Sequence, residues 1–173
     1  MKIISALYLL FFTGFFIDGA KAQGLFDFGG EATTQYNRGK LEQDSGNFKE
    51  AVRWYKKAIE TEPRHYESYN NIGFIYGSNG YHRKAVEWYK KSIQVNPKFV
   101  QGLSNLGASY IELGKEKLAV DVLKKARVLD PESQLVANNY ATALRGVGRI
   151  EESIAILKSC LLYTSPSPRD DYE

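Results

Sequence analysis

Four asparagines that recur every 34 residues are the side chains of this sequence best suited to polar recognition. They are Asn37, Asn71, Asn105 and Asn139. A carboxamide offers both a hydrogen-bond donor and an acceptor, so such a row can bind the backbone of an extended peptide. The alternative is that the amides satisfy neighbouring loops of the same chain. The spacing leaves both interpretations open.

Residue types that support catalysis or metal binding lack suitable neighbours in the sequence. His65 and His82 are the two histidines, and neither has the spacing to cysteine or acidic residues that a metal site needs. The sequence contains no phosphate-binding loop, nucleophile elbow or His-Glu-x-x-His motif. We therefore expect no catalytic residue, no metal and no cofactor, and we predict that the chain is not an enzyme.

The asparagines belong to a longer pattern with the same period. The ends of successive units are marked by Pro63, Pro97 and Pro131. Glycines mark a turn inside each unit, at Gly46, Gly80, Gly114 and Gly148. Each unit holds two runs of helical periodicity, and the second run stops at a proline that a helix cannot pass. A fixed period of this size is typical of a repeat architecture.

These residues resemble the tetratricopeptide repeat family. The units begin at Ala32, Tyr66, Val100 and Gln134. Position 8 is small, as Gly39, Gly73, Gly107 and Ala141, and so is position 20, as Ala51, Ala85, Ala119 and Ser153. Position 24 is large, as Tyr55, Tyr89, Leu123 and Leu157. Position 4 departs from the aromatic residue of the family, being Gln35 in the first unit and Ala137 in the fourth.

The resemblance implies an all-α fold, a right-handed superhelical solenoid of helix-turn-helix repeats. Three full repeats are expected at 32–65, 66–99 and 100–133, with a truncated fourth at 134–159. Helices are expected at about 33–44, 48–61, 67–78, 82–95, 101–113, 116–129, 135–145 and from about 151. Further core candidates are Trp54, Trp88, Ile59, Ile93, Ile72 and Leu106.

In this family the first helix of each pair lines a concave groove that binds a protein or peptide partner. The face carried over to this chain consists of Tyr36, Asn37, Lys40, Gln43, Asn70, Asn71, Phe74, Ser104, Asn105, Ala108, Ile111, Asn138, Thr142 and Arg145. Its middle is apolar, and Lys40 and Arg145 place one cation near each end. In this family a clamp for chaperone C-terminal tails uses lysine at position 5 and asparagine at position 9 of one repeat. These positions are Tyr36 and Lys40 in the first repeat and Asn70 and Phe74 in the second, so the clamp is absent.

The charge pattern argues against a nucleic-acid partner. The formal net charge is only +3, from 23 basic and 20 acidic residues. Lysine pairs recur on the second helices, at 56–57, 90–91 and 124–125, but acidic residues are interleaved with them. We interpret this row as a solvated face.

The first 22 residues are typical of a secretory signal peptide. Lys2 precedes an apolar run from Ile3 to Ile17, and the segment ends in Ala20, Lys21 and Ala22. We therefore expect an exported protein, in a periplasm, a secretory lumen or the medium. The alternative is an uncleaved N-terminal membrane anchor, which would be the chain's one membrane contact. Residues 23–31 are expected to form a linker or an N-terminal cap.

The last residues, 160–173, have a different character from the repeats. Cys160 to Asp170 can be encoded by DNA that resembles a transposase-based sequencing adapter, and the alternative is a native Ser/Pro-rich disordered tail. We expect the fourth repeat to be interrupted near Ser159. Ile154 and Leu157 would then form an exposed apolar face open to self-association.

Together these patterns predict an exported scaffold or adaptor that binds a protein or extended peptide in its groove. The alternative is the non-catalytic N-terminal part of a larger exported enzyme, such as a glycosyltransferase with such repeats, or of an envelope-assembly factor.

Overall fold

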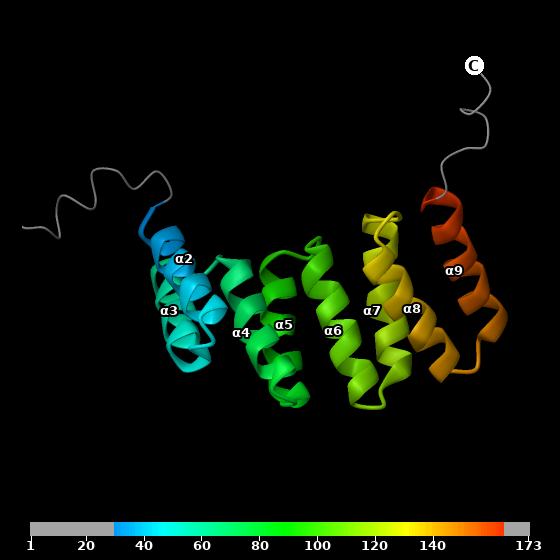
Figure 1. Cartoon of the computed structure of the whole chain (residues 1–173), viewed down its shortest axis with the longest axis horizontal. Coiled ribbons are helices and arrows are strands. Elements are labelled where there is room, and N and C mark those ends of the chain that lie inside the picture. Colours follow the sequence, from blue (N-terminus) through cyan, green and yellow to red (C-terminus); the bar gives the residue numbers. More distant parts are fainter. Residues whose placement is uncertain (1–29, 165–173) are drawn as a thin grey trace, which may run out of the picture.

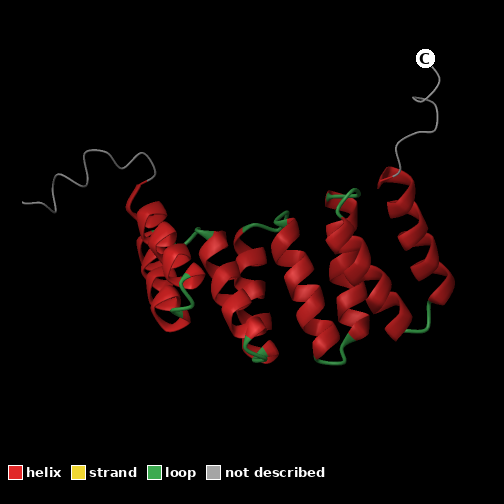
Figure 2. Ribbon diagram, viewed as in Figure 1, coloured by secondary structure: helices red, strands yellow, loops and turns green. Residues whose placement is uncertain are grey.

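The computed structural model describes residues 30–164, and every regular element in that range is an α-helix (Figure 2). In chain order the helices are α2 (Gly30–Asp44), α3 (Phe48–Thr61), α4 (Tyr66–Ser78), α5 (His82–Val95), α6 (Val100–Glu112), α7 (Glu116–Leu129), α8 (Gln134–Gly146) and α9 (Ile150–Thr164). The expected signal peptide and the end of the tail lie outside the described residues, so neither is tested.

The helices pack as successive antiparallel pairs, α2 with α3, α4 with α5, α6 with α7 and α8 with α9. The pairs stand side by side along the long axis of the molecule (Figure 1). The turn glycine makes each pair possible. Gly46, for example, has a φ of 78°, and the Asn47 N–H closes the end of α2 by donating to the Glu42 carbonyl at 2.8 Å. The predicted all-α helical repeat fold is confirmed.

Within a pair, the small residue at position 8 makes room for the large residue at position 24. A Cβ added at Gly39 would lie 2.6 Å from the Tyr55 ring, and one at Gly73 would lie 2.8 Å from the Tyr89 ring. Both rings are buried in this contact. The sequence pattern of small and large positions therefore sets how closely the two helices approach.

Direct contacts between repeats distinguish an inner from an outer side of the array. The first helices of neighbouring pairs contact each other, α4 with α6 and α6 with α8. Among the described helices, the second helices of neighbouring pairs have no comparable contact. Because helices that approach one another lie on the inside of a curved stack, α4, α6 and α8 form the inner, concave wall.

Two of the six further core candidates are buried, and the other four are only half-buried. Ile72 and Leu106 are buried. Trp54 and Trp88, on the second helices, are only half-buried, and each has a lysine ammonium over its ring. The Lys57 nitrogen lies 4.2 Å from the Trp54 centroid, and the Lys91 nitrogen lies 4.4 Å from the Trp88 centroid. Ile59 and Ile93 are also half-buried.

Two boundaries of the array differ from the expected ones. Helix α2 begins at Gly30, so Gly30 and Glu31 belong to the first helix and not to the linker. Helix α9 continues through Thr164, beyond the interruption expected near Ser159. The reason is compositional, because Cys160, Leu161 and Leu162 are compatible with a helix whatever their origin. Ile154 and Leu157 are exposed, at 47% and 37%.

Candidate peptide-binding groove

A row of side-chain hydrogen bonds joins the first helices of neighbouring repeats along the inner wall. The Asn71 amide donates to the Tyr36 hydroxyl at 3.3 Å. The Asn105 amide donates to the Asn70 side-chain Oδ1 at 3.0 Å, and the Asn139 amide donates to the Ser104 hydroxyl at 3.1 Å. Each bond links position 6 of one repeat to position 5 of the repeat before it. We call this row the asparagine ladder.

The asparagine ladder answers part of the question that the sequence left open. Asn71, Asn105 and Asn139 bond to the adjacent helix, and not to the loops that we considered as alternative partners. An amide NH₂ carries two N–H groups, so Asn105 and Asn139 each keep one donor beyond the ladder bond, whereas Asn71 also donates to the Tyr55 hydroxyl at 3.2 Å. Binding of a peptide backbone by these amides stays a prediction. Asn37 is exposed on α2.

The predicted groove residues differ widely in exposure. The exposed ones are Asn37, Lys40, Phe74, Asn138 and Arg145. The half-buried ones are Tyr36, Gln43, Asn71, Asn105, Ala108, Ile111 and Thr142. Asn70 and Ser104 are buried, at 6% and 1%, and serve as acceptors of the asparagine ladder. Their polar atoms position the neighbouring helix and do not face solvent.

The structure brings three of the predicted residues together around one pocket. Phe74, Asn105 and Ala108 line a pocket of about 200 Å³ between α4, α5 and α6. The other lining residues are Gly77, Ser78, His82, Tyr89, Ser109 and Glu112. Phe74 is a large apolar side chain that is 46% exposed at this pocket. The remaining predicted residues lie along the same first helices but outside this pocket.

Sequence reasoning did not include Tyr89, His82 or Glu112 in the groove. Tyr89 has the position-24 pattern of a packing residue, and it does pack, but its edge also reaches this pocket. His82 and Glu112 lie at the start of α5 and the end of α6, next to the turns. The sequence signal for this pocket was the difference at position 12, which is Gln43 in the first repeat and Gly77 in the second. Glycine has no side chain, so it leaves the wall open there.

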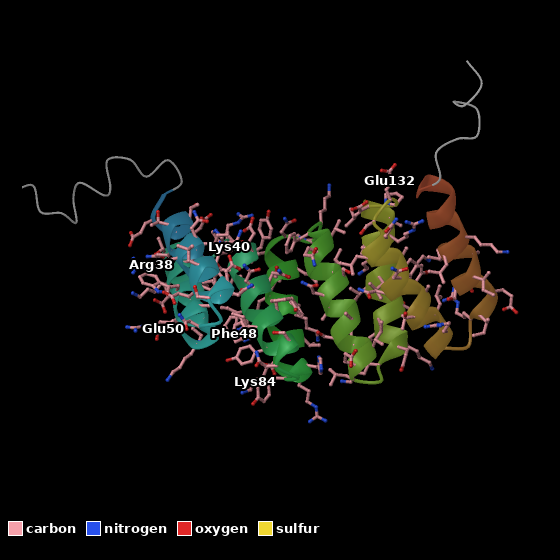
Figure 3. All side chains as sticks on the ribbon, in the orientation of Figure 1. Arg38, Lys40, Phe48, Glu50, Lys84 and Glu132 are labelled. Carbon is pink, nitrogen blue, oxygen red and sulfur yellow. The ribbon has the colours of Figure 1, made fainter. Side chains whose placement is uncertain are left out.

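The groove carries few charges. Lys40 lies on α2 in the first repeat (Figure 3), and Arg145 lies in the last turn of α8. Glu112 contributes a carboxylate at the central pocket. Within residues 30–159, no cluster of His, Cys, Asp or Glu has a geometry that would hold a metal ion. No helix between residues 30 and 164 has the length and apolar content that a membrane span requires. The site is therefore an elongated, weakly charged surface with one side-chain-sized pocket at its centre.

Comparison with protein families identifies the repeats directly. Residues 39–80 match the family described as TPR repeat, and residues 66–99 match the family described as tetratricopeptide repeat. No curated protein matches the chain in a sequence comparison.

Solved structures with the same fold include several repeat proteins of low sequence identity. The first TPR of Spaghetti (RPAP3) bound to the HSP90 peptide SRMEEVD has a TM-score of 0.65 and 18% identity, over 68% of this chain and 93% of that one. MamA has a TM-score of 0.70 and 20% identity, over 76% and 77%. YrrB, described as a TPR protein with an unusual peptide-binding site, has a TM-score of 0.70 and 19% identity, over 78% and 69%. At these identities the likeness concerns the fold.

Proposed function

Since this chain carries tetratricopeptide repeats, we propose that it is an exported scaffold or adaptor that binds a protein or extended peptide along the inner wall of α2, α4, α6 and α8. The protein has no catalytic activity of its own in this proposal. Binding is reversible recognition on an ordered surface, so little conformational entropy of the protein is lost when the partner docks.

The observation that carries this proposal is the open inner wall at Phe74. An aromatic side chain that is 46% exposed beside a pocket is a favourable anchor for an apolar group of a partner. Half-buried Ile111 and Ala108 extend the apolar surface on the next helix. Two structurally similar proteins also support the proposal, because the Spaghetti repeat domain was solved with a bound peptide and YrrB is described as having a peptide-binding site.

The proposal is tested by selecting peptides from a random display library on the purified protein and measuring their affinity by fluorescence anisotropy. Phe74→Asp is expected to weaken binding at least tenfold, since it places a charge against an apolar contact. Ile111→Asp should act in the same direction. Circular dichroism should show nearly unchanged helicity for Phe74→Asp, because the side chain is exposed in the free protein.

The matched control is Val128→Asp, which introduces the same charge at a residue of α7 that is 74% exposed and lies outside the first helices. It should leave peptide affinity within about twofold, since no inner-wall contact changes. Equal loss of binding in both variants, or loss of helicity in Phe74→Asp, would contradict the groove assignment.

Export is the part of the proposal that rests on the first 22 residues alone. Expression of the full chain in a secreting host, followed by mass spectrometry of the mature protein, should give an N-terminus at Gln23. Recovery of intact Met1 in the membrane fraction would favour the uncleaved anchor instead.

A further inference from the structure

Two buried tyrosines at equivalent positions of neighbouring repeats have different hydrogen-bond partners. Tyr55 is fully buried, and its hydroxyl donates to the Gln43 side-chain oxygen at 3.0 Å and accepts from the Asn71 amide at 3.2 Å. Tyr89 is 3% exposed, and its hydroxyl makes no hydrogen bond to another described residue. The hydroxyl is not among the fully enclosed polar atoms that lack a partner, so part of it stays accessible. The second repeat therefore lacks a polar contact that the first repeat possesses.

The difference has two causes in the sequence. The residue equivalent to Gln43 is Gly77, which has no side chain to accept a hydrogen bond from the phenol. The residue equivalent to Asn71 is Asn105, and its amide nitrogen donates to Asn70 and not to Tyr89. The Tyr89 hydroxyl therefore lacks both partners that the Tyr55 hydroxyl has. Gly77 replaces the glutamine, and the Asn105 amide donates to another residue.

The unpartnered hydroxyl faces the central pocket. Tyr89 and Gly77 both line it, and a Cβ built on Gly77 would lie 3.6 Å from the Tyr89 hydroxyl oxygen. The space left by the missing glutamine side chain is therefore part of the pocket. Burial raises the pKa of the Tyr89 hydroxyl above its usual range, so the phenol keeps its proton and remains a donor.

The size of the pocket limits what can occupy it. About 200 Å³ is below the range of roughly 300–1,000 Å³ that is typical of pockets for drug-sized ligands. One side chain of a bound peptide is the occupant that fits this volume and the open groove around it. Phe74 and Ala108 supply an apolar surface for the stem of such a side chain, and the lining also includes polar side chains.

We propose that this pocket binds a carboxamide side chain, glutamine or asparagine, of a peptide in the groove. The carboxamide oxygen accepts the Tyr89 hydrogen bond, as Gln43 does for Tyr55 within the chain itself. Its NH₂ group can donate to Glu112 or to the Asn105 oxygen at the same pocket. This inference rests on the proposed function, because it names the side chain by which the inner wall recognises its partner.

The pocket disfavours apolar and acidic side chains. An apolar side chain would cover the Tyr89 hydroxyl without giving it a hydrogen-bond partner, which is unfavourable. A carboxylate would accept from Tyr89 but would be repelled by Glu112. A carboxamide supplies both an acceptor for the phenol and a donor for the carboxylate without adding charge.

The test uses fluorescein-labelled nonapeptide pools in which the central residue is fixed as Gln, Asn, Glu or Leu and all other positions are random. Anisotropy should show that the full-length protein binds the Gln or Asn pool about threefold to tenfold more tightly than the Leu and Glu pools, as expected for one buried hydrogen bond. Tyr89→Phe should reduce this preference to within about twofold, because the ring stays and the hydroxyl is lost.

Two further variants separate the pocket from the fold. Tyr55→Phe removes the equivalent phenol in the first repeat and should keep the preference, since that hydroxyl is already bonded to Gln43. Gly77→Gln rebuilds the side chain of the first repeat inside the pocket and should abolish the preference while raising the melting temperature. It provides an independent test if Tyr89→Phe folds poorly.

The outcomes distinguish this inference from the proposed function. If the pools bind equally to the wild-type protein and Phe74→Asp still prevents binding, the carboxamide pocket is overturned and the groove stands. A preference that survives both Tyr89→Phe and Gly77→Gln also overturns it. If no pool binds at all, the proposed function fails, and the pocket proposal fails with it.

Discussion

Gly73 and Gly77 lie one turn apart on α4 and tolerate a side chain very differently. A Cβ at Gly73 would lie 2.8 Å from the Tyr89 ring, closer than real Cβ atoms approach. A Cβ at Gly77 would meet only the Ala85 methyl at 3.5 Å and the Tyr89 hydroxyl at 3.6 Å, which are ordinary contacts. One glycine is therefore required for packing, and the other leaves space at the groove.

The same substitution at these two positions should have opposite effects on stability. We expect Gly73→Ala to lower the free energy of unfolding by about 1–3 kcal/mol, because the buried Tyr89 ring must shift. Gly77→Ala should raise it by about 0.5–1 kcal/mol, since alanine replaces glycine in a helix without a clash. Urea denaturation of both variants measures the difference. Equal destabilisation by the two substitutions would mean that the pocket at Gly77 is not open.

The sequence predicted the packing role of single residues, but it did not predict the pocket. The small residue at Gly73 and the large one at Tyr89 follow from the repeat pattern, and the structure places them in contact. The pocket depends on how one repeat differs from the next, at Gln43 and Gly77, and on which neighbour Asn105 contacts. Averaging the repeats into one pattern hides such differences, because hydrogen-bond partners depend on three-dimensional orientation.

At the scale of helices, the asparagine ladder couples each first helix to the one before it. Ser104 is 1% exposed, and its hydroxyl accepts from Asn139 at 3.1 Å, so this bond between α6 and α8 is shielded from water. A shielded hydrogen bond contributes more specificity than an exposed one, since breaking it leaves polar atoms without partners. The ladder therefore helps to set the register between neighbouring repeats.

A double-mutant cycle should detect this coupling. Ser104→Ala and Asn139→Ala are expected to show an interaction energy of about 1 kcal/mol, with the double variant less destabilised than the sum of the single ones. The control is Asn138→Ala, an exposed neighbour on the same helix, which should show no coupling to Ser104→Ala. Thermal or urea unfolding of the set gives the energies. Additive effects of Ser104→Ala and Asn139→Ala would mean that the bond does not link the two helices.

The expected helix boundaries agree better with the second helices of the repeats than with the first helices. The second helices α3, α5 and α7 have the expected bounds, because a turn glycine and a proline enclose each of them. Helices α4, α6 and α8 each begin one residue earlier than expected. At the start of α4 the His65 ring accepts a hydrogen bond from the Ser68 N–H at 3.3 Å. Histidine is not a usual capping residue, so residue type alone does not indicate this cap.

At the scale of the whole molecule, the array has an apolar surface on its last described helix. Ile154 and Leu157 are three residues apart on α9, and both are exposed. In a stacked array each pair normally covers the apolar face of the pair before it. No helix among residues 30–164 packs on the outer side of α9.

This exposed face should promote association between copies of the chain. We expect the average mass in sedimentation equilibrium to rise with protein concentration, because burial of the face removes apolar surface from water. Ile154→Lys combined with Leu157→Lys should keep the protein monomeric over the same range. A matched double change at exposed Leu118 and Val128 on α7, each to Lys, is the control and should leave association unchanged. A wild-type protein that stays monomeric throughout would contradict the expectation.

We propose that the inner wall formed by the first helices is the surface on which this protein binds its partner. The most direct measurement is a titration of the ¹⁵N-labelled protein with a selected peptide, followed by two-dimensional ¹H–¹⁵N NMR. We predict that the largest shift changes fall on α4 and α6, around Phe74, Asn105 and Ile111, with smaller ones on α2 and α8. Changes centred on the outward helices α3, α5 and α7, around Lys57, Lys91 or Val128, would contradict it.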